Sequence, residues 1–307
     1  MKYLFTGGNG FLARNLGRRL VSEGHAVFLL SRRLRQNQPD YPNSPAIIPW
    51  DGRNTGSWTS AIEGSDVVVN LAGESIAGGR WTAGRKKGIL QSRVGATRAI
   101  VQALREAKRK PRVLLSASAV GYYGNVERGD VNEDGVQGSG FLADVCGQWE
   151  REALEARQHG VRVVLMRFGV VLGRDGGALA RMMIPFRLFL GGPIGSGNQW
   201  LPWIHLDDVF GIMKFAVERP AIAGPLNVVA PELVTMQRFC ASLGAAMRRP
   251  SWLPVPAILL RAAFGEMAGT LLTGQRVLPH RLRGFGYSYI FPSLVPAIEE
   301  AVTRHRQ

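Results

Sequence analysis

A glycine-rich segment near the N-terminus has the spacing of a phosphate-binding turn. Residues 6–16 read TGGNGFLARNL. Gly7 allows a tight turn, and Gly10 lets a pyrophosphate approach the backbone closely. A helix that starts at Phe11 and Leu12 leaves its first N–H groups without partners inside the helix, and these groups favour an anion. The spacing therefore predicts a dinucleotide site, the alternative being a glycine turn that holds no ligand.

The end of the next apolar run indicates which dinucleotide the site prefers. Residues 27–30 read VFLL, and Ser31, Arg32 and Arg33 follow them. An NAD-specific protein usually has an acidic residue here, which holds the ribose 2′-hydroxyl. A hydroxyl and a guanidinium instead suit a 2′-phosphate through charge-assisted hydrogen bonds. This end predicts NADP(H) over NAD, unless the arginines are merely exposed basic residues.

Six more residues are expected to contact the cofactor, five of them because it lies across the carboxyl ends of the strands. The run VVVN at 67–70 ends in the turn Leu71, Ala72, Gly73 and Glu74. Gly169 follows another apolar run, at 161–167. Arg93 lies on an expected helix over 83–107, where it can point at the phosphates or simply face solvent.

Proton chemistry is assigned to Ser118, at the end of the expected strand over 113–118, and to Tyr122 and Tyr123, which follow it. The Ser118 hydroxyl can donate a hydrogen bond to a substrate oxygen. An unassisted phenol has a pKa of about 10, so a tyrosine that gives up a proton needs a nearby cation such as Arg93. The alternative is that Tyr123 belongs to a structural turn.

Two other sets of residues carry reactive side chains, but we expect them to have structural roles. His205 stands close to Asp207 and Asp208, and a carboxylate can orient an imidazole. We expect this group mainly to fix the substrate region to the core. Cys146 is interpreted as a small buried hydrophobe, and the two cysteines form no metal-binding pattern, so no metal is predicted.

The elements that position these residues alternate between strand and helix. Apolar runs at 2–5, 27–30, 46–50, 67–71, 113–118 and 161–167 alternate with helical periodicity through about residue 170. This order is typical of an α/β protein, a Rossmann-type doubly wound parallel sheet. We expect an NADP-binding domain over 1–230, with a substrate-side loop insertion at about 174–205. A smaller, mainly helical C-terminal substrate region is expected over 231–307.

Composition narrows the classes of partner. The 307 residues are 46% hydrophobic and 20% charged, with a net charge of +15. The basic residues are spread along the chain, which favours solvated surface over a nucleic-acid site. No apolar run reaches the ~18 residues of a membrane helix, so no membrane partner is predicted. The opening residues already form a strand, so no signal peptide is expected, and two distant cysteines favour a cytoplasmic location. The oligomeric state stays open.

Long motifs resemble a known family, the extended short-chain dehydrogenase/reductases. The resemblance is strongest to an atypical NAD(P)-dependent branch, called epimerase family protein and in bacteria sometimes cell-division inhibitor. It rests on NLAGESIAGGRW at 70–81, SASAVGYYG at 116–124, RFGVVLGRDGGAL at 167–179, PFRLFLGGPIGSGNQWLPWIHLDDV at 185–209 and GQRVLP at 274–279. The C-terminal part resembles the domain of unknown function that this branch carries.

The resemblance implies an NADP-dependent oxidoreductase or epimerase-like enzyme acting on an unknown small molecule. Ser118 matches the family's active-site serine. The family's Tyr-x-x-x-Lys pair is missing, because it falls either on Phe141 and Val145 or on Leu142 and Cys146. No lysine lies between Lys110 and Lys214. Two alternatives therefore stay open: a non-catalytic NADPH-binding regulatory protein, and a nucleotide-sugar epimerase.

Overall fold

A parallel sheet forms the centre of the computed structural model, which describes residues 1–32, 44–174 and 176–303. Its strands within those ranges lie in the order β10-β7-β5-β4-β1-β2-β3, and each neighbouring pair is parallel. Their bounds are β1 Lys2–Phe5, β2 Ala26–Ser31, β3 Ala46–Pro49, β4 Val67–Asn70, β5 Val113–Ala119, β7 Arg162–Phe168 and β10 Gly224–Val228. The predicted Rossmann-type sheet is confirmed.

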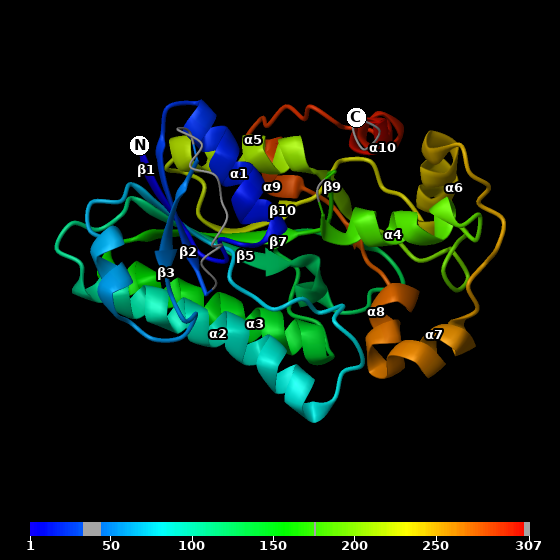
Figure 1. The fold of residues 1–307 in the computed structure, drawn as a ribbon, viewed down its shortest axis with the longest axis horizontal. Coiled ribbons are helices and arrows are strands. Elements are labelled where there is room, and N and C mark those ends of the chain that lie inside the picture. The colour runs from blue at the N-terminus through cyan, green and yellow to red at the C-terminus, as the bar shows by residue number, and fades with distance from the viewer. Residues whose placement is uncertain (33–43, 175, 304–307) are drawn as a thin grey trace.

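Alternating side chains give the sheet two apolar faces. Tyr3 and Phe5 of β1 belong to one buried cluster, and Leu4 between them belongs to the other. Helices α1 (Phe11–Ser22) and α5 (Leu206–Glu218) cover the first face, and α2 (Ala83–Glu106) and α3 (Phe141–Leu154) cover the second (Figure 1). Since both faces are covered, the strands read as continuous apolar runs.

The segment expected as a loop insertion at about 174–205 contains regular structure. Helix α4 spans Gly177–Arg187, and β9 (Trp203–His205) pairs with β8 (Val170–Leu172) in a separate parallel ladder. Glycines on both sides of α4 hide its apolar period in the sequence. Leu179, Met183 and Phe186 of α4 nevertheless face the core.

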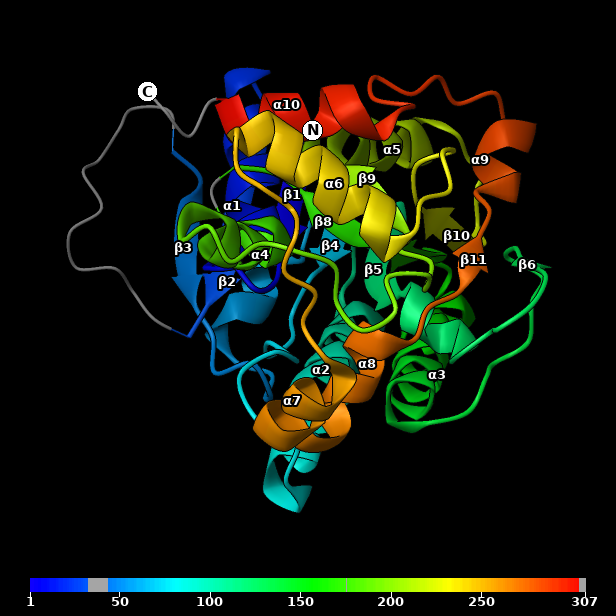
Figure 2. The same ribbon diagram turned by 90° about the vertical axis from the view of Figure 1, so that its right-hand side faces the viewer.

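The C-terminal region is mainly helical, as predicted. It holds α6 (Met236–Met247), α7 (Ala257–Phe264), α8 (Gly269–Leu272), α9 (His280–Gly284) and α10 (Leu294–Thr303), and β11 (Arg276–Val277) pairs with β6 (Asp130–Val131) (Figure 2). Phe239 and Ile298 share one buried cluster with Phe5 and Leu16. This buried cluster contains residues from both sides of position 230. The domain boundary expected there stays a prediction.

Candidate functional site

The glycine turn of the sequence prediction connects β1 to α1. Gly7 has a left-handed backbone with φ +67°, and its carbonyl accepts the N–H of Gly10 at 2.7 Å. Helix α1 begins at Phe11, and the N–H of Arg14 donates to the carbonyl of Gly10. The N–H groups of Phe11 and Leu12 precede that bond and have no acceptor inside the helix. With the positive end of the helix dipole, they make the start of α1 suited to an anion.

Neighbouring strands pack closely against the glycine turn at Gly7 and Gly8, whereas the turn is more open at Gly10. A Cβ at Gly7 would lie 2.7 Å from the carbonyl oxygen of Leu71, and one at Gly8 would lie 2.8 Å from the Cβ of Leu29. A Cβ at Gly10 would meet the carbonyl oxygen of Gly7 at 2.9 Å and no other described atom within 4 Å. The turn therefore packs between β2 and β4, and the backbone at Gly10 leaves space for a phosphate. The residues present fit the diphosphate of a dinucleotide.

Thr6 fixes the neighbouring strand end, a role that the sequence prediction missed. Its buried hydroxyl accepts the N–H groups of Leu71 and Ala72 at 2.9 and 3.0 Å and donates to Asn70. The Asn70 amide in turn donates to Thr97 on α2 at 2.7 Å. The turn at 71–74 is thus tied to β1, so both candidate cofactor segments keep one relative position. A threonine directly before the glycines was the available signal.

The end of β2 gathers polar groups beside the glycine turn. Ser31 is buried and accepts a hydrogen bond of 2.7 Å from the side-chain amide of Asn9, which the prediction also missed. Arg32 is exposed, and its guanidinium lies 3.8 Å from the Glu74 carboxylate. Glu74 also pairs with Arg85 at 3.3 Å. Arg33 lies outside the described residues. The residues predicted to hold a 2′-phosphate are consecutive, with Ser31 buried at the end of β2 and Arg32 exposed directly after it.

Arg93 contacts the strand-end turn through its guanidinium. It donates to the carbonyl oxygens of Glu74 and Ile89, both at 3.0 Å, and lies over the ring of Trp149. Burial lowers the pKa of Arg93. A Cβ at Gly73 would lie 3.0 Å from the guanidinium carbon, so this glycine makes room for the arginine. These contacts make Arg93 a support of the turn at 73–74.

A buried ion pair lies beneath the predicted catalytic serine. The Ser118 hydroxyl donates to Glu150 on α3 at 2.6 Å. Arg167 on β7 donates to both oxygens of the same carboxylate, each at 2.8 Å. Burial opposes the charge of Arg167, but its bonds to Glu150 outweigh that effect and raise the pKa of the guanidinium. The single hydroxyl proton of Ser118 is therefore used inside the protein, which differs from the hydrogen bond to substrate that the sequence suggested.

The two adjacent tyrosines have different environments. Tyr123 is buried, donates to Asn227 at 2.7 Å and accepts from Arg167 at 2.9 Å. Burial raises the pKa of Tyr123 to about 12. Tyr122 is partly exposed, and the guanidinium of Arg167 lies 3.6 Å from the centre of its ring. Its hydroxyl has no hydrogen bond to another described residue, so Tyr122 is the tyrosine with a proton to offer.

The positions where the family's Tyr-x-x-x-Lys pair would fall carry no acid or base of ordinary reactivity. Cys146 is buried beside Ser118 and Glu150, and burial, with the Glu150 carboxylate, raises the pKa of its thiol to about 11. Phe141 packs edge-on against Trp81, with ring centres 5.0 Å apart. In place of the usual tyrosine and lysine, these positions carry apolar side chains and a thiol.

Phe11 and Gly169 contribute through packing. A Cβ at Gly173 would lie 2.7 Å from the Phe11 ring, and ones at Gly176 and Gly177 would lie 3.2 and 3.3 Å from it. Phe11 therefore fills a space between glycines, and only its backbone N–H faces the anion position. A Cβ at Gly169 would lie 2.7 Å from the Pro202 carbonyl oxygen, so the close approach of the residue between β7 and β8 to the residue before β9 already requires this glycine.

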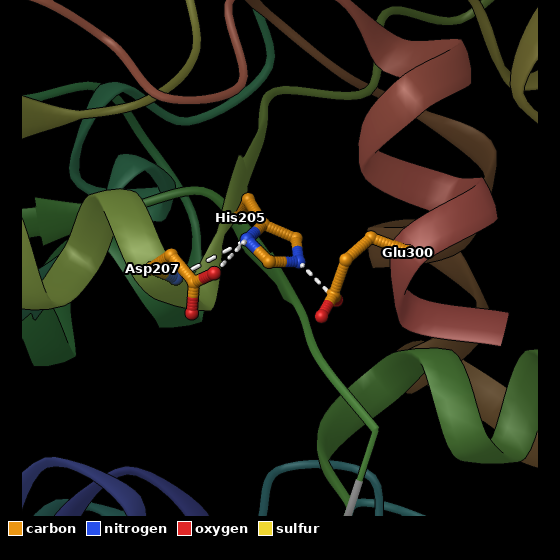
Figure 3. Close-up of side chains that lie close together, drawn as sticks. All are labelled: His205, Asp207 and Glu300. Carbon is orange, nitrogen blue, oxygen red and sulfur yellow. Dashed lines mark hydrogen bonds and ion pairs between the residues drawn. The ribbon is translucent and has the colours of Figure 1, made fainter. Parts of the chain in front are cut away.

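His205 connects the core to the C-terminal helix (Figure 3). Its Nδ1 accepts the backbone N–H of Asp207 at 3.2 Å, so its Nε2 carries the proton that faces Glu300 on α10 at 3.0 Å. The two carboxylates lie on opposite sides of the imidazole, and each also pairs with an arginine, Asp207 with Arg19 and Glu300 with Arg174. One donor atom from each of the three side chains lies within 4.8 Å of the others, but each carboxylate is already held by an arginine. This geometry gives His205 the structural role that the sequence favoured.

The chain matches known protein families over most of its length. Residues 3–229 match the NAD dependent epimerase/dehydratase family, and residues 255–301 match a domain of unknown function, DUF1731. Among the helices in the described ranges, none combines the length and the apolar character that a membrane crossing requires.

Similar proteins come from plants, bacteria and animals. The chain is 41% identical to the chloroplastic epimerase family protein SDR39U1 homolog of Arabidopsis thaliana, covering 95% of this chain and 84% of that protein. It is 37% identical to epimerase family protein YfhF of Bacillus subtilis, covering 98% of both chains.

Solved structures give the same result. The structure of human epimerase family protein SDR39U1 with NADPH aligns with a TM-score of 0.88 at 37% identity, over 99% of both chains. A UDP-glucuronic acid 4-epimerase of Bacillus cereus, 18% identical with a TM-score of 0.80, shares the fold. On the family match over residues 3–229 and these relatives, the chain belongs to the NAD dependent epimerase/dehydratase family.

Proposed function

We propose that this chain binds NADP(H) and is an atypical oxidoreductase or epimerase-like enzyme acting on an unknown small molecule. The observation that carries the proposal is the turn from β1 to α1, with Ser31 and Arg32 beside it at the end of β2. The human relative solved with NADPH, 37% identical over 99% of both chains, supports the same cofactor.

Each part of the dinucleotide has residues suited to hold it. The N–H groups of Phe11 and Leu12 would receive the diphosphate, with the close approach at Gly10. Ser31 and Arg32 would hold the 2′-phosphate. The turn Leu71, Ala72 and Gly73 lies at the next strand end, where a dinucleotide crosses the sheet. When bound, the nicotinamide gives or takes a hydride, and the protein supplies position and a hydrogen bond to the substrate.

Tyr122 is the proposed hydrogen-bond donor to the substrate oxygen. The protons of Ser118 and Tyr123 are used by Glu150 and Asn227, whereas the Tyr122 hydroxyl has no described partner. Arg167 lies against the Tyr122 ring at 3.6 Å and holds it in place. Ser118 can still accept a hydrogen bond, through the lone pairs of its oxygen.

A non-catalytic NADPH-binding regulatory protein is the second candidate. It is favoured by one observation, the apolar and thiol side chains Phe141, Leu142, Val145 and Cys146 at the positions of the usual Tyr-Lys pair. A nucleotide-sugar epimerase is less well supported, for the same reason. For the enzyme, we further propose that the substrate is a small molecule, that no nucleic acid is a partner and that the location is cytoplasmic.

A two-step experiment tests the function. Calorimetry with NADPH and NADH measures cofactor binding, and we expect NADPH to bind more tightly. A screen of aldehydes, ketones and nucleotide-sugars then follows NADPH oxidation, with product analysis for the sugars. Turnover that is lost in Tyr122→Phe supports the enzyme. NADPH binding with no turnover on any class favours the regulatory protein, and no NADPH binding refutes both.

A further inference from the structure

Large apolar side chains are exposed together at one end of the molecule. They lie after α4, in the loop after α6 and on α7: Leu188, Phe189, Leu190, Trp252, Ile258 and Leu259. We call this set the apolar face. Phe189, Trp252 and Ile258 are 53%, 67% and 74% exposed. Figure 1 shows α4, α6 and α7 at the same end, and Figure 2 looks onto that end.

Backbone contacts join the segments of the apolar face. The indole N–H of Trp252 donates to the carbonyl oxygen of Phe189 at 3.1 Å, and its backbone N–H donates to Gly191 at 3.0 Å. Val255 forms a bridge with Ile194 directly before α7 begins. The segments that carry the exposed side chains are therefore joined to one another.

The two chain segments that carry the apolar face contain no acidic residue. Residues 176–206 and 233–265 contain no aspartate or glutamate. Four arginines lie in or beside the apolar face: Arg187, Arg248, Arg249 and Arg261. None of them has a carboxylate partner among the described residues, although acids elsewhere pair with many of the other cations. The segments that carry the apolar face therefore hold positive charges only.

The backbone at this surface takes an unusual conformation. In the described ranges, Phe189 (φ 61°) and Arg248 (φ 55°) are the two non-glycine residues with a left-handed backbone. Such conformations are sparsely populated and persist where surrounding contacts fix them. The guanidinium of Arg249 lies 4.4 Å from the centre of the Phe189 ring. The backbone at one aromatic residue and one cation of the face is thus fixed in an uncommon conformation.

We propose that the apolar face binds the surface of an anionic lipid bilayer. Exposed tryptophan, leucine and isoleucine can enter the interface between head groups and acyl chains, while arginines bind anionic head groups. The sequence predicted no membrane partner because no run can span a bilayer, but binding to one leaflet needs no such run. A second copy of the chain is a poorer occupant, because its arginines would meet like charges.

Vesicle binding by the full chain tests the proposal. The protein is sedimented with phosphatidylcholine vesicles, with or without about 30% phosphatidylglycerol. We expect binding to the anionic vesicles at about 50 mM salt and weakening at about 500 mM. Acyl chains that carry bromine should quench the fluorescence of bound protein, and Trp252→Phe should remove most of that quenching.

Variants locate the binding surface. Ile258→Ser with Leu259→Ser should weaken binding roughly tenfold or more, and Arg187→Ala with Arg261→Ala should weaken it by roughly fivefold for each arginine. Val136→Ser and Arg18→Ala, exposed residues outside the face, are the matched controls and should bind as the native chain does. Circular dichroism and NADPH affinity check that each variant is folded.

Three results would overturn the proposal. The first is no sedimentation with anionic vesicles at low salt. The second is binding that the face variants and the controls reduce equally, which would make it a general effect of the positive charge. The third is a concentration-dependent dimer that the face variants abolish, which would assign this face to a second copy of the chain.

Discussion

The hydroxyl of Ser118 donates to the carboxylate of Glu150 over 2.6 Å, and both side chains are buried. Since Arg167 holds the same carboxylate through two bonds of 2.8 Å, the serine belongs to a buried charge network. The network joins β5, α3 and β7 beneath Tyr122.

The Arg167–Glu150 pair should contribute strongly to stability. Glu150→Gln leaves the Arg167 charge buried without a full counter-ion, and we expect a loss of about 3–5 kcal/mol in the free energy of unfolding. Glu152 lies on the same helix as Glu150 and pairs at the surface with Arg98 of α2, and Glu152→Gln should cost about 0–1 kcal/mol. Urea unfolding measures both variants. Equal losses would show that burial of the pair is not decisive.

Tyr122→Phe should slow turnover by ~10²–10⁴, the usual contribution of a positioned proton donor. NADPH affinity should stay within a few-fold, because the ring remains in place. Ser118→Ala should slow turnover less, since its proton is already used by Glu150. Tyr123→Phe should instead lower the stability by about 1–3 kcal/mol, because Asn227 loses its donor. A normal rate for Tyr122→Phe would remove this residue from the mechanism.

Arg32→Ala should lower the affinity for NADPH by about 10- to 100-fold, the loss expected for a charge-assisted contact to the 2′-phosphate. The affinity for NADH should not change, because NADH lacks that phosphate. Arg18→Ala serves as the control, because it removes a different exposed arginine, which lies on α1. Calorimetry with both cofactors gives the comparison, and a parallel loss for NADH would mean that Arg32 acts elsewhere.

Gly10→Val should abolish dinucleotide binding. Its Cβ would press on the carbonyl oxygen of Gly7 at 2.9 Å, and its branches would fill the space in front of the turn. Gly84→Ala is the control, because a Cβ at Gly84 has no described atom within 4 Å. Calorimetry with NADPH checks both variants, with circular dichroism to confirm the fold. Normal binding by Gly10→Val would place the phosphate site elsewhere.

Alkaline pH should destabilise the fold. Burial raises the pKa of Cys146 from 9.0 to about 11 and that of Tyr123 from 10.0 to about 12. The native state therefore keeps protons that the unfolded chain has lost. The stability from these groups is complete below about pH 9 and falls as the pH rises through 11 and 12. Urea midpoints at about pH 8 and about pH 10.5 measure the fall. Cys146→Ala with Tyr123→Phe should make it shallower, and equal midpoints in the native chain would contradict the prediction.

The sheet could be predicted well from the sequence, because a strand that is buried on both faces consists of an unbroken apolar run. The expected strand at 113–118 is observed as Val113–Ala119, and the helix expected over 83–107 is observed as Ala83–Glu106. Helix α4 was not predicted, since Gly176 and Gly177 at its start and Gly191 and Gly192 after it read as loop. Short apolar periods between glycines do not distinguish a helix from an irregular segment.

The candidate site was predictable where its chemistry is local in sequence. The turn at Gly7 and Gly10 could be read from consecutive residues. The distinction between Tyr122 and Tyr123 could not, because it depends on Asn227 and Arg167, which lie far along the chain. The orientation of Ser118 likewise depends on Glu150, 32 residues away.

The packing of Phe11 between glycines has an evolutionary consequence. A Cβ at position 173 would lie 2.7 Å from the Phe11 ring, so an alanine there requires the ring to move or a smaller side chain at position 11. The two positions cannot drift independently, although they are far apart in sequence. The order in which two such substitutions arise then decides whether the intermediate survives, which makes this contact a site of epistasis.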